Sequence, residues 1–255
     1  MRISNQILMP ALVVCTLTAC SNSKKNNQSK TAKTMETNQV EETSSDESEK
    51  AVVFFLSVKN PDETDAYNDY SSASHELLTE AGATTIGMYN IDTTVFGDCA
   101  GQTFGYAEAP TEKVLTNVFS SDEYKALIPT RDKAFTSMNI FIGTWNELAD
   151  SNVLNSDKES LFLTVGAINS EEQEAYHTYV DESEKVATSY GINTLLSFKI
   201  NKQIAGECGS DFIWLKEGND DSVWGALSED ENYKKWVPFR NKGIASMNGY
   251  IITKK

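Results

Sequence analysis

The chain contains two copies of one unit, and this internal repeat restricts its possible folds more than any other feature. When residues 51–146 are placed over residues 160–255, at a constant offset of 109 and without gaps, 24 of the 96 positions are identical. The identities include residue types with special structural roles: Gly82 and Gly191, Tyr70 and Tyr179, Cys99 and Cys208, and Pro129 and Pro238. An ungapped register of this length indicates a duplicated unit, and units this small gain stability by burying surface against each other.

Each unit begins with a strand and a helix. The β-branched and aromatic runs at 52–56 and 161–165 are too short for helices and predict buried strands. Asn60 and Asn169 are suited to cap a helix, so we expect a helix to begin at each of them. A glycine 22 residues later in both copies predicts the end of that helix, because glycine readily takes the left-handed conformation.

The rest of each unit reads as two strands, a second helix and a last strand. Strand pairs are expected at 84–96 with 102–107 and at 193–205 with 211–216, and last strands at 139–142 and 248–253. The second helix begins near Thr111, restarts at Ser121 and should break before Pro129, because proline removes a helix hydrogen bond. This βαββαβ order predicts an α+β fold with a ferredoxin-like sheet that carries both helices on one face. The strands are apolar on both faces, so the second copy is expected to cover the bare face.

The segment 119–131, which follows a hairpin at Gly97 and Asp98, resembles the dimeric α/β-barrel superfamily and, within it, a small-domain group of unknown function. The resemblance covers 51–143 well and 160–253 less closely. It implies tandem ferredoxin-like repeats that pack sheet to sheet as an intramolecular dimeric α/β barrel in a monomeric protein. Relatives in that superfamily include cofactor-independent and haem-degrading monooxygenases and many proteins without a known activity, so the fold does not choose a function.

The first residues of the chain read as an export signal. Arg2 precedes an apolar stretch at 7–14 that is too short to span a bilayer. The motif Leu-Thr-Ala-Cys that ends at Cys20 resembles the bacterial lipoprotein signal, which implies removal of residues 1–19 and attachment of lipid, palmitate included, to Cys20. Residues 20–50 are polar almost throughout and predict a disordered tether.

The lipid on Cys20 would make the membrane a partner of this protein and place it in the cell envelope. Ser21 and Asn22 are not acidic, which by resemblance to enterobacterial sorting favours the periplasmic face of the outer membrane. The alternative is a secretory signal that is cut nearby, with Cys20 as an ordinary thiol.

Composition argues against several classes of function. The 37 acidic and 22 basic residues give a net charge of −15, which repels phosphate backbones, so nucleic acid is not expected as a partner. With two histidines and four cysteines that do not cluster, neither a metal nor a cofactor is predicted. The sequence also contains no phosphate-binding glycine loop and no Gly-x-Ser-x-Gly motif.

The candidate ligand-binding residues are aromatic and cationic side chains that recur in both copies: Tyr67, Tyr70, Tyr176, Tyr179, Arg131 and Arg240. The tyrosines lie one turn apart on the inner face of the first helices, where they could line a pocket or belong to the core. The arginines follow the two helix-breaking prolines by two residues. They could clamp a carboxylate, or they could serve the structure by binding free carbonyl groups or an aspartate.

The histidines and the remaining cysteines complete the candidates. His75 and His177 could act as a base or a haem ligand, but they fall off the apolar helix face, which predicts solvated side chains. Cys99 and Cys208 could form a disulfide in an exported protein. We nevertheless expect isolated thiols, because sheet-to-sheet packing should place the two hairpins at opposite ends of the barrel.

The sequence therefore predicts two repeats, at 51–143 and 160–255, joined by a linker at 144–159. The expected function is that of a lipid-anchored envelope protein that binds a small apolar molecule in its barrel. The alternatives are a cofactor-independent, monooxygenase-like enzyme of the same fold and a non-catalytic envelope scaffold.

Overall fold

The computed structural model describes residues 49–146 and 160–255. The predicted export signal at 1–19, Cys20, most of the predicted tether and most of the predicted linker lie outside the described residues. Within the described ranges, no helix combines the length and the apolar character that crossing a membrane requires.

The two repeats contain the same strands and the same first helix at the same offset. Repeat 1 consists of β1 (Ala51–Lys59), α1 (Thr64–Glu80), β2 (Thr84–Phe96), β3 (Thr103–Ala109), α2 (Glu112–Ser120), α3 (Asp122–Ala134) and β4 (Phe135–Trp145). Repeat 2 consists of β5 (Ser160–Ile168), α4 (Gln173–Ser189), β6 (Asn193–Ala205), β7 (Phe212–Gly218), α5 (Ser222–Glu229), α6 (Glu231–Lys234), α7 (Val237–Gly243) and β8 (Ile244–Lys254). All strands and α1 recur 109 residues later without a shift, which confirms the register found in the sequence.

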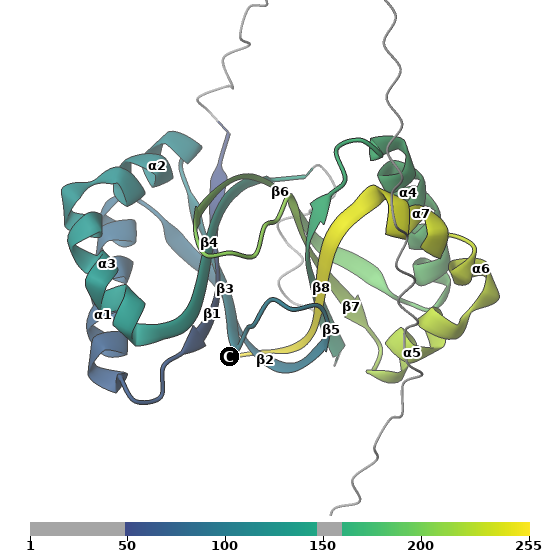
Figure 1. Ribbon diagram of the computed structural model, residues 1–255, viewed down its shortest axis with the longest axis horizontal. Coiled ribbons are helices and arrows are strands. Elements are labelled where there is room, and N and C mark those ends of the chain that lie inside the picture. Colours follow the sequence, from purple (N-terminus) through teal and green to yellow (C-terminus); the bar gives the residue numbers. More distant parts are fainter. Residues whose placement is uncertain (1–48, 147–159) are drawn as a thin grey trace, which may run out of the picture. The chain divides into compact units, whose positions relative to one another are not determined.

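The eight strands form one closed antiparallel barrel in the order β1-β3-β2-β8-β5-β7-β6-β4 (Figure 1). Within each repeat this is the ferredoxin-like order, so the predicted α+β fold with tandem repeats is confirmed. The repeats meet at two edges, where β2 pairs with β8 and β4 pairs with β6. The two sheets therefore not only cover each other but also share hydrogen bonds, so that no strand in the described ranges has a free edge.

The barrel interior is filled by side chains from both repeats, and the helices cover its outer faces. Along β1, Val52 and Phe54 point into a core shared with Phe198 and Tyr250 of repeat 2. The alternating residues, such as Val53, face a second cluster beneath the helices of repeat 1. This alternation explains why the strand is apolar at successive positions, because both of its faces are buried.

The first helices begin later than predicted. α1 starts at Thr64, and Asn60 forms a turn in which its side chain accepts a hydrogen bond from the Asp62 amide at 3.2 Å. The Asn60 amide group also donates to the Lys133 carbonyl at 3.1 Å, which ties the turn to the end of α3. Asn169 repeats this arrangement in the other copy. The predicted helix ends are confirmed, because both glycines that follow have positive φ angles, 82° and 71°.

The second helices differ between the repeats. The predicted break before Pro129 is wrong for repeat 1, since α3 continues through the proline to Ala134. Tyr124 and Ala134 are buried on either side of Pro129, and this packing compensates for the lost hydrogen bond. In repeat 2 the chain does break, and Pro238 lies in the first turn of α7.

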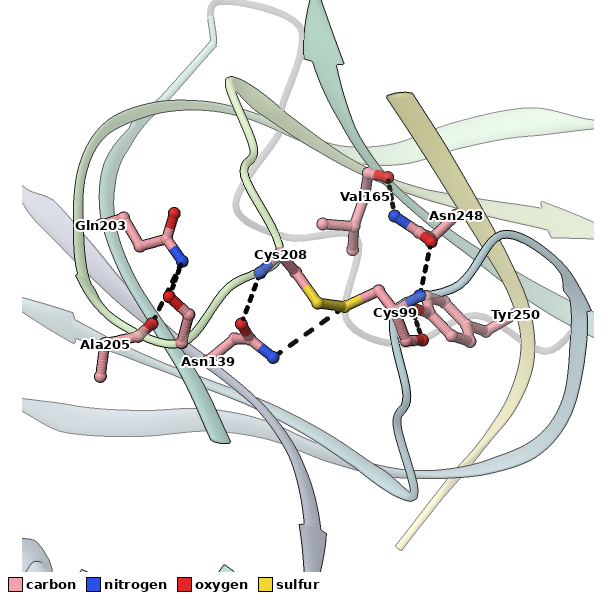
Figure 2. The surroundings of a disulfide bond; sticks show 9 residues. Cys99, Asn139, Val165, Gln203, Ala205, Cys208, Asn248 and Tyr250 are labelled. Atoms are coloured by element: carbon pink, nitrogen blue, oxygen red, sulfur yellow. Dashed lines mark hydrogen bonds between the residues drawn. A yellow bond between two sulfur atoms is a disulfide. The ribbon is translucent and has the colours of Figure 1, made fainter. Parts of the chain in front are cut away.

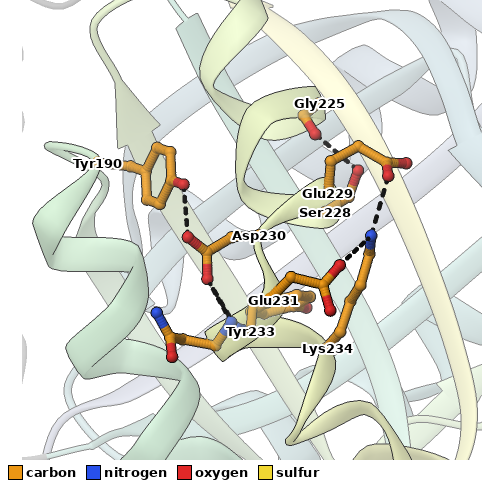
Figure 3. A network of polar contacts seen from close by, with 9 residues as sticks. Tyr190, Gly225, Ser228, Glu229, Asp230, Glu231, Tyr233 and Lys234 are labelled. Carbon is orange, nitrogen blue, oxygen red and sulfur yellow. Dashed lines mark hydrogen bonds and ion pairs between the residues drawn. The ribbon is translucent and has the colours of Figure 1, made fainter.

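A polar network holds the broken helices of repeat 2 (Figure 3). Asp230 caps α6 by accepting hydrogen bonds from the amides of Asn232 and Tyr233 at 2.6 and 3.0 Å. The Tyr190 hydroxyl, at the end of α4, donates to the same carboxylate at 2.7 Å. One side chain therefore caps one helix and anchors it to another.

Cys99 and Cys208 form a disulfide, with their Cα atoms 5.8 Å apart, so the expectation of separated thiols is wrong (Figure 2). Their separation of 109 residues equals the repeat offset, so the bond joins equivalent residues and must lie on the approximate twofold axis. The Cys99 amide donates to Asn248, and the Cys208 amide donates to Asn139, each at 3.0 Å. The expectation failed because β2 extends along β8 to Gly249, which carries its hairpin loop into the other repeat.

Replacing both cysteines, as C99S/C208S, should lower the free energy of unfolding by about 2–4 kcal/mol, because the bond closes a long loop in the unfolded chain. Urea unfolding of the oxidised protein and of the variant would measure the difference. The non-reduced protein should weigh two protons less than its reduced form. Equal stabilities, together with an intact variant barrel by circular dichroism, would contradict a stabilising role for this bond.

Candidate ligand cavity

A cavity of about 210 Å³ lies between α1 and the helix-facing side of the repeat 1 sheet. Its α1 wall includes the predicted residues Tyr67 and Tyr70 together with His75 and Leu78. The strand side contributes Phe55 and Ser57 from β1, Thr85 and Met88 from β2, Thr103, Gly105 and Ala107 from β3, and Phe135 and Met138 from β4. The lining is therefore mainly apolar and aromatic, with hydroxyl groups among it, as in many small-molecule sites.

The cavity exists because β3 presents small side chains to the helix. Thr103, Gly105 and Ala107 alternate along the strand and share one face. At the equivalent positions of repeat 2, β7 carries large side chains, which are Phe212, Trp214 and Lys216. The space that is hollow in repeat 1 is thus occupied in repeat 2 by the protein itself.

The large side chains that fill this space in repeat 2 contact one another and the first helix of that repeat. The rings of Phe212 and Trp214 stack with centroids 4.2 Å apart, and Trp214 stacks on Tyr176 at 6.2 Å. Lys216 forms an ion pair with Glu184, which stands at the position of His75 in repeat 1. Of the four tyrosines predicted from the sequence, the two in repeat 1 line the cavity and the two in repeat 2 are packed in the helix layer.

Each repeat contains a hydroxyl pair that the sequence analysis missed. The Tyr70 and Tyr124 hydroxyls lie 3.2 Å apart, and those of Tyr179 and Tyr233 lie 2.9 Å apart, so each pair joins the first helix to the second helical segment. Burial, and then the neighbouring Tyr124, raise the pKa of Tyr70 well above its usual range. The hydroxyl of Tyr70, a residue of the cavity wall, is therefore neutral. The identity of Tyr124 and Tyr233 at the repeat offset is the signal that could have revealed the pairs.

The two arginines take structural positions outside the cavity lining. Arg131 donates to the carboxylate of the adjacent Asp132, from Nε at 3.0 Å and from Nη2 at 2.8 Å. Arg240 makes the matching contacts with the side chain of Asn241, at 3.2 and 3.1 Å. In each case the next side chain along the chain is a partner of the guanidinium group.

Both histidines are exposed, as predicted, but their surroundings differ. His75 lies at the rim of the cavity, whereas His177 stands beside the ring of Tyr176 with centroids 5.3 Å apart. The Lys59 ammonium lies 4.3 Å from the centre of the Tyr67 ring. The cavity rim therefore offers an imidazole and several hydroxyl groups for hydrogen bonding.

A second hollow, of about 830 Å³, surrounds the disulfide on the approximate twofold axis. It is lined by the two hairpin loops and the starts of β4 and β8, with no aromatic side chain among its lining residues. Asp98, Thr136 and Glu207 on its walls are exposed. A ligand there would stay in contact with water, so the smaller and more apolar cavity is the better candidate site.

The chemistry of the cavity suits binding. Among the residues that the structure describes, no group of three or more His, Cys, Asp and Glu side chains could hold a metal ion. An apolar cavity of about 150 Å³ can bind benzene. The repeat 1 cavity is of a size for one or two rings.

The architecture is shared with solved structures. An anthrone oxidase-like protein matches with a TM-score of 0.53 and 13% identity, over 81% of this chain and 92% of its own. A variant of chlorite dismutase from Candidatus Nitrospira defluvii matches with a TM-score of 0.50 and 12% identity, over 80% of this chain and 91% of its own. No protein-family model matches the chain, and no curated protein matches it. At such low identities these likenesses establish only the dimeric α/β-barrel fold, here closed within one chain.

The packing of Tyr176 in repeat 2 predicts a change of stability at alkaline pH. Burial raises the pKa of Tyr176 to about 12, with a further contribution from Asp211. An unfolded tyrosine ionises near pH ~10, so the full stabilisation is present below that pH and is lost as the pH rises toward 12. In urea unfolding between pH 9 and 11, Tyr176→Phe should lose stability above pH 10 less steeply than the unaltered chain, by up to ~1.4 kcal/mol per pH unit. Identical slopes would contradict this assignment.

Proposed function

We propose that this protein binds a small, largely apolar molecule in the repeat 1 cavity. The observation that supports this is the row of small side chains on β3, which keeps a space open beneath α1 where repeat 2 places aromatic rings. A cavity of this kind destabilises the fold, because the side chains around it lose packing contacts. A bound ligand would restore those contacts.

The binding test uses the purified chain and a panel of neutral apolar probes such as phenol, indole and cyclohexanol. A probe at a hundred times its Kd should stabilise the protein by about 2.7 kcal/mol, which appears as a higher Tm. Thr103→Phe, which copies Phe212 into repeat 1, should abolish this shift. The matched variant Thr103→Ser should keep it, because it leaves the cavity open.

A flat response to every probe would contradict the binding function and favour a scaffold. Oxygen consumption during incubation with a reduced quinol would instead indicate the monooxygenase-like alternative. No observation on the cavity favours that chemistry over binding.

We also propose that the protein acts in the cell envelope, anchored by lipid on Cys20 and facing the periplasm from the outer membrane. The motif that ends at Cys20 supports this, and so does the disulfide, since such bonds persist in oxidising compartments. The small ligand would then be one that is present outside the cytoplasm.

Cys20→Ser should abolish incorporation of labelled palmitate and move the protein from the membrane fraction to the soluble fraction. The physical reason is that no helix in the described residues could hold the chain in a bilayer in place of the lipid. Ser23→Ala is a matched control, because it alters a nearby residue and leaves both the thiol and the residues directly after it intact. Labelling of the Cys20→Ser variant would contradict the assignment.

A further inference from the structure

The two repeats hold different contents in the same space beneath the first helix. In repeat 2 the Trp214 indole stacks on Tyr176, with an angle of 21° between the ring planes. In repeat 1 the equivalent Tyr67 has an edge contact with Phe135, at 5.6 Å and 64°, and Gly105 stands where the indole would be. Tyr67 therefore lacks the parallel ring partner that its counterpart has, and the Lys59 ammonium lies 4.3 Å from the centre of its ring.

One pair of neighbouring residues on the second and third strands of each repeat has its large and small members exchanged between the repeats. Met88 on β2 pairs with Gly105 on β3, whereas the equivalent pair in repeat 2 is Ser197 with Trp214. Each pair thus contains one large and one small residue, on opposite strands. A side chain on Gly105 would collide with the Met88 sulfur, so in repeat 1 the Met88 side chain lies where the side chain of residue 105 would begin.

The polar groups at the rim are exchanged as well. In repeat 2 Glu184 accepts a hydrogen bond from the Thr194 hydroxyl at 2.7 Å and pairs with Lys216. Repeat 1 keeps the threonine as Thr85, replaces the carboxylate by His75 and replaces the lysine by Ala107. Its rim therefore offers hydrogen bonds without a built-in ion pair.

The charge of repeat 1 argues against an anionic ligand. Residues 49–146 contain 14 acidic and 6 basic side chains, a net charge of −8. Four of the acidic residues, Asp65, Asp69, Glu76 and Glu80, lie on α1 itself. A surface of this charge lowers the local concentration of anions.

We propose that Trp214 is a built-in occupant of the repeat 2 site and shows the kind of ligand that repeat 1 binds. That ligand is a neutral, planar compound of about two fused rings. It stacks on Tyr67 and carries one oxygen or nitrogen that hydrogen-bonds with His75 or Thr85. The inference rests on the proposed binding function and adds the ligand class and a single site per chain.

The first experiment compares 1-naphthol with its saturated counterpart, decahydro-1-naphthol, by isothermal titration calorimetry. The two share a carbon skeleton and a hydroxyl group, but only 1-naphthol is planar. The expected result is one site per chain, with 1-naphthol bound at least tenfold more tightly. Equal affinities would overturn the planar ligand class while leaving the binding function in place. If neither compound nor any apolar probe binds, both proposals fail.

The second experiment exchanges the residue pairs between the repeats. M88S/G105W gives repeat 1 the residue pair that repeat 2 has, and it should abolish 1-naphthol binding. Circular dichroism and the Tm would show that the barrel is still folded. S197M/F212T/W214G also removes the Phe212 ring, opens repeat 2 and should raise the stoichiometry from one to two. Unchanged binding by a folded M88S/G105W variant would overturn the site, and this variant decides the question if S197M/F212T/W214G does not fold.

Discussion

Closure of the barrel is the constraint on which the rest of the structure depends. Each repeat ends in a strand that pairs with the second strand of the other repeat, β4 with β6 and β8 with β2. These two seams bury the inner faces of both sheets at once, and they leave the described part of the chain without a strand edge for another chain to pair with. A single repeat would expose one whole apolar sheet face to water, so the unit of folding is the pair.

Much of this fold could be predicted because each strand and first helix occurs twice in the sequence, at a constant offset of 109 residues. Strands at 84–96 and 193–205 were expected and are present with those bounds. The predictions that failed have a common cause: they depend on contacts between residues that are far apart in the sequence. Asn60 forms a turn that is tied to Lys133 before α1 begins, and Pro129 does not end α3 because the residues around it are buried. Local propensity carries no information on such contacts.

The candidate cavity was harder to predict than the fold. Tyr67 and Tyr70 were identified because aromatic residues recur at helical spacing, but the residues that create the space are Thr103, Gly105 and Ala107. Small residues on a strand give no signal by themselves. Only comparison with their large counterparts in the second repeat shows that they keep a space open. Equivalent residues are similar in the two repeats where they form the barrel, and they differ in size where repeat 1 has its cavity.

The position of the disulfide has a consequence for the history of the chain. A residue on a twofold axis meets its own copy, so one cysteine per unit is enough to form the bond. Two separate subunits, each with a single cysteine at this position, would be crosslinked in the same way. Joining them into one chain therefore needs no new cysteine, and the covalent link between the halves does not depend on the peptide that connects them.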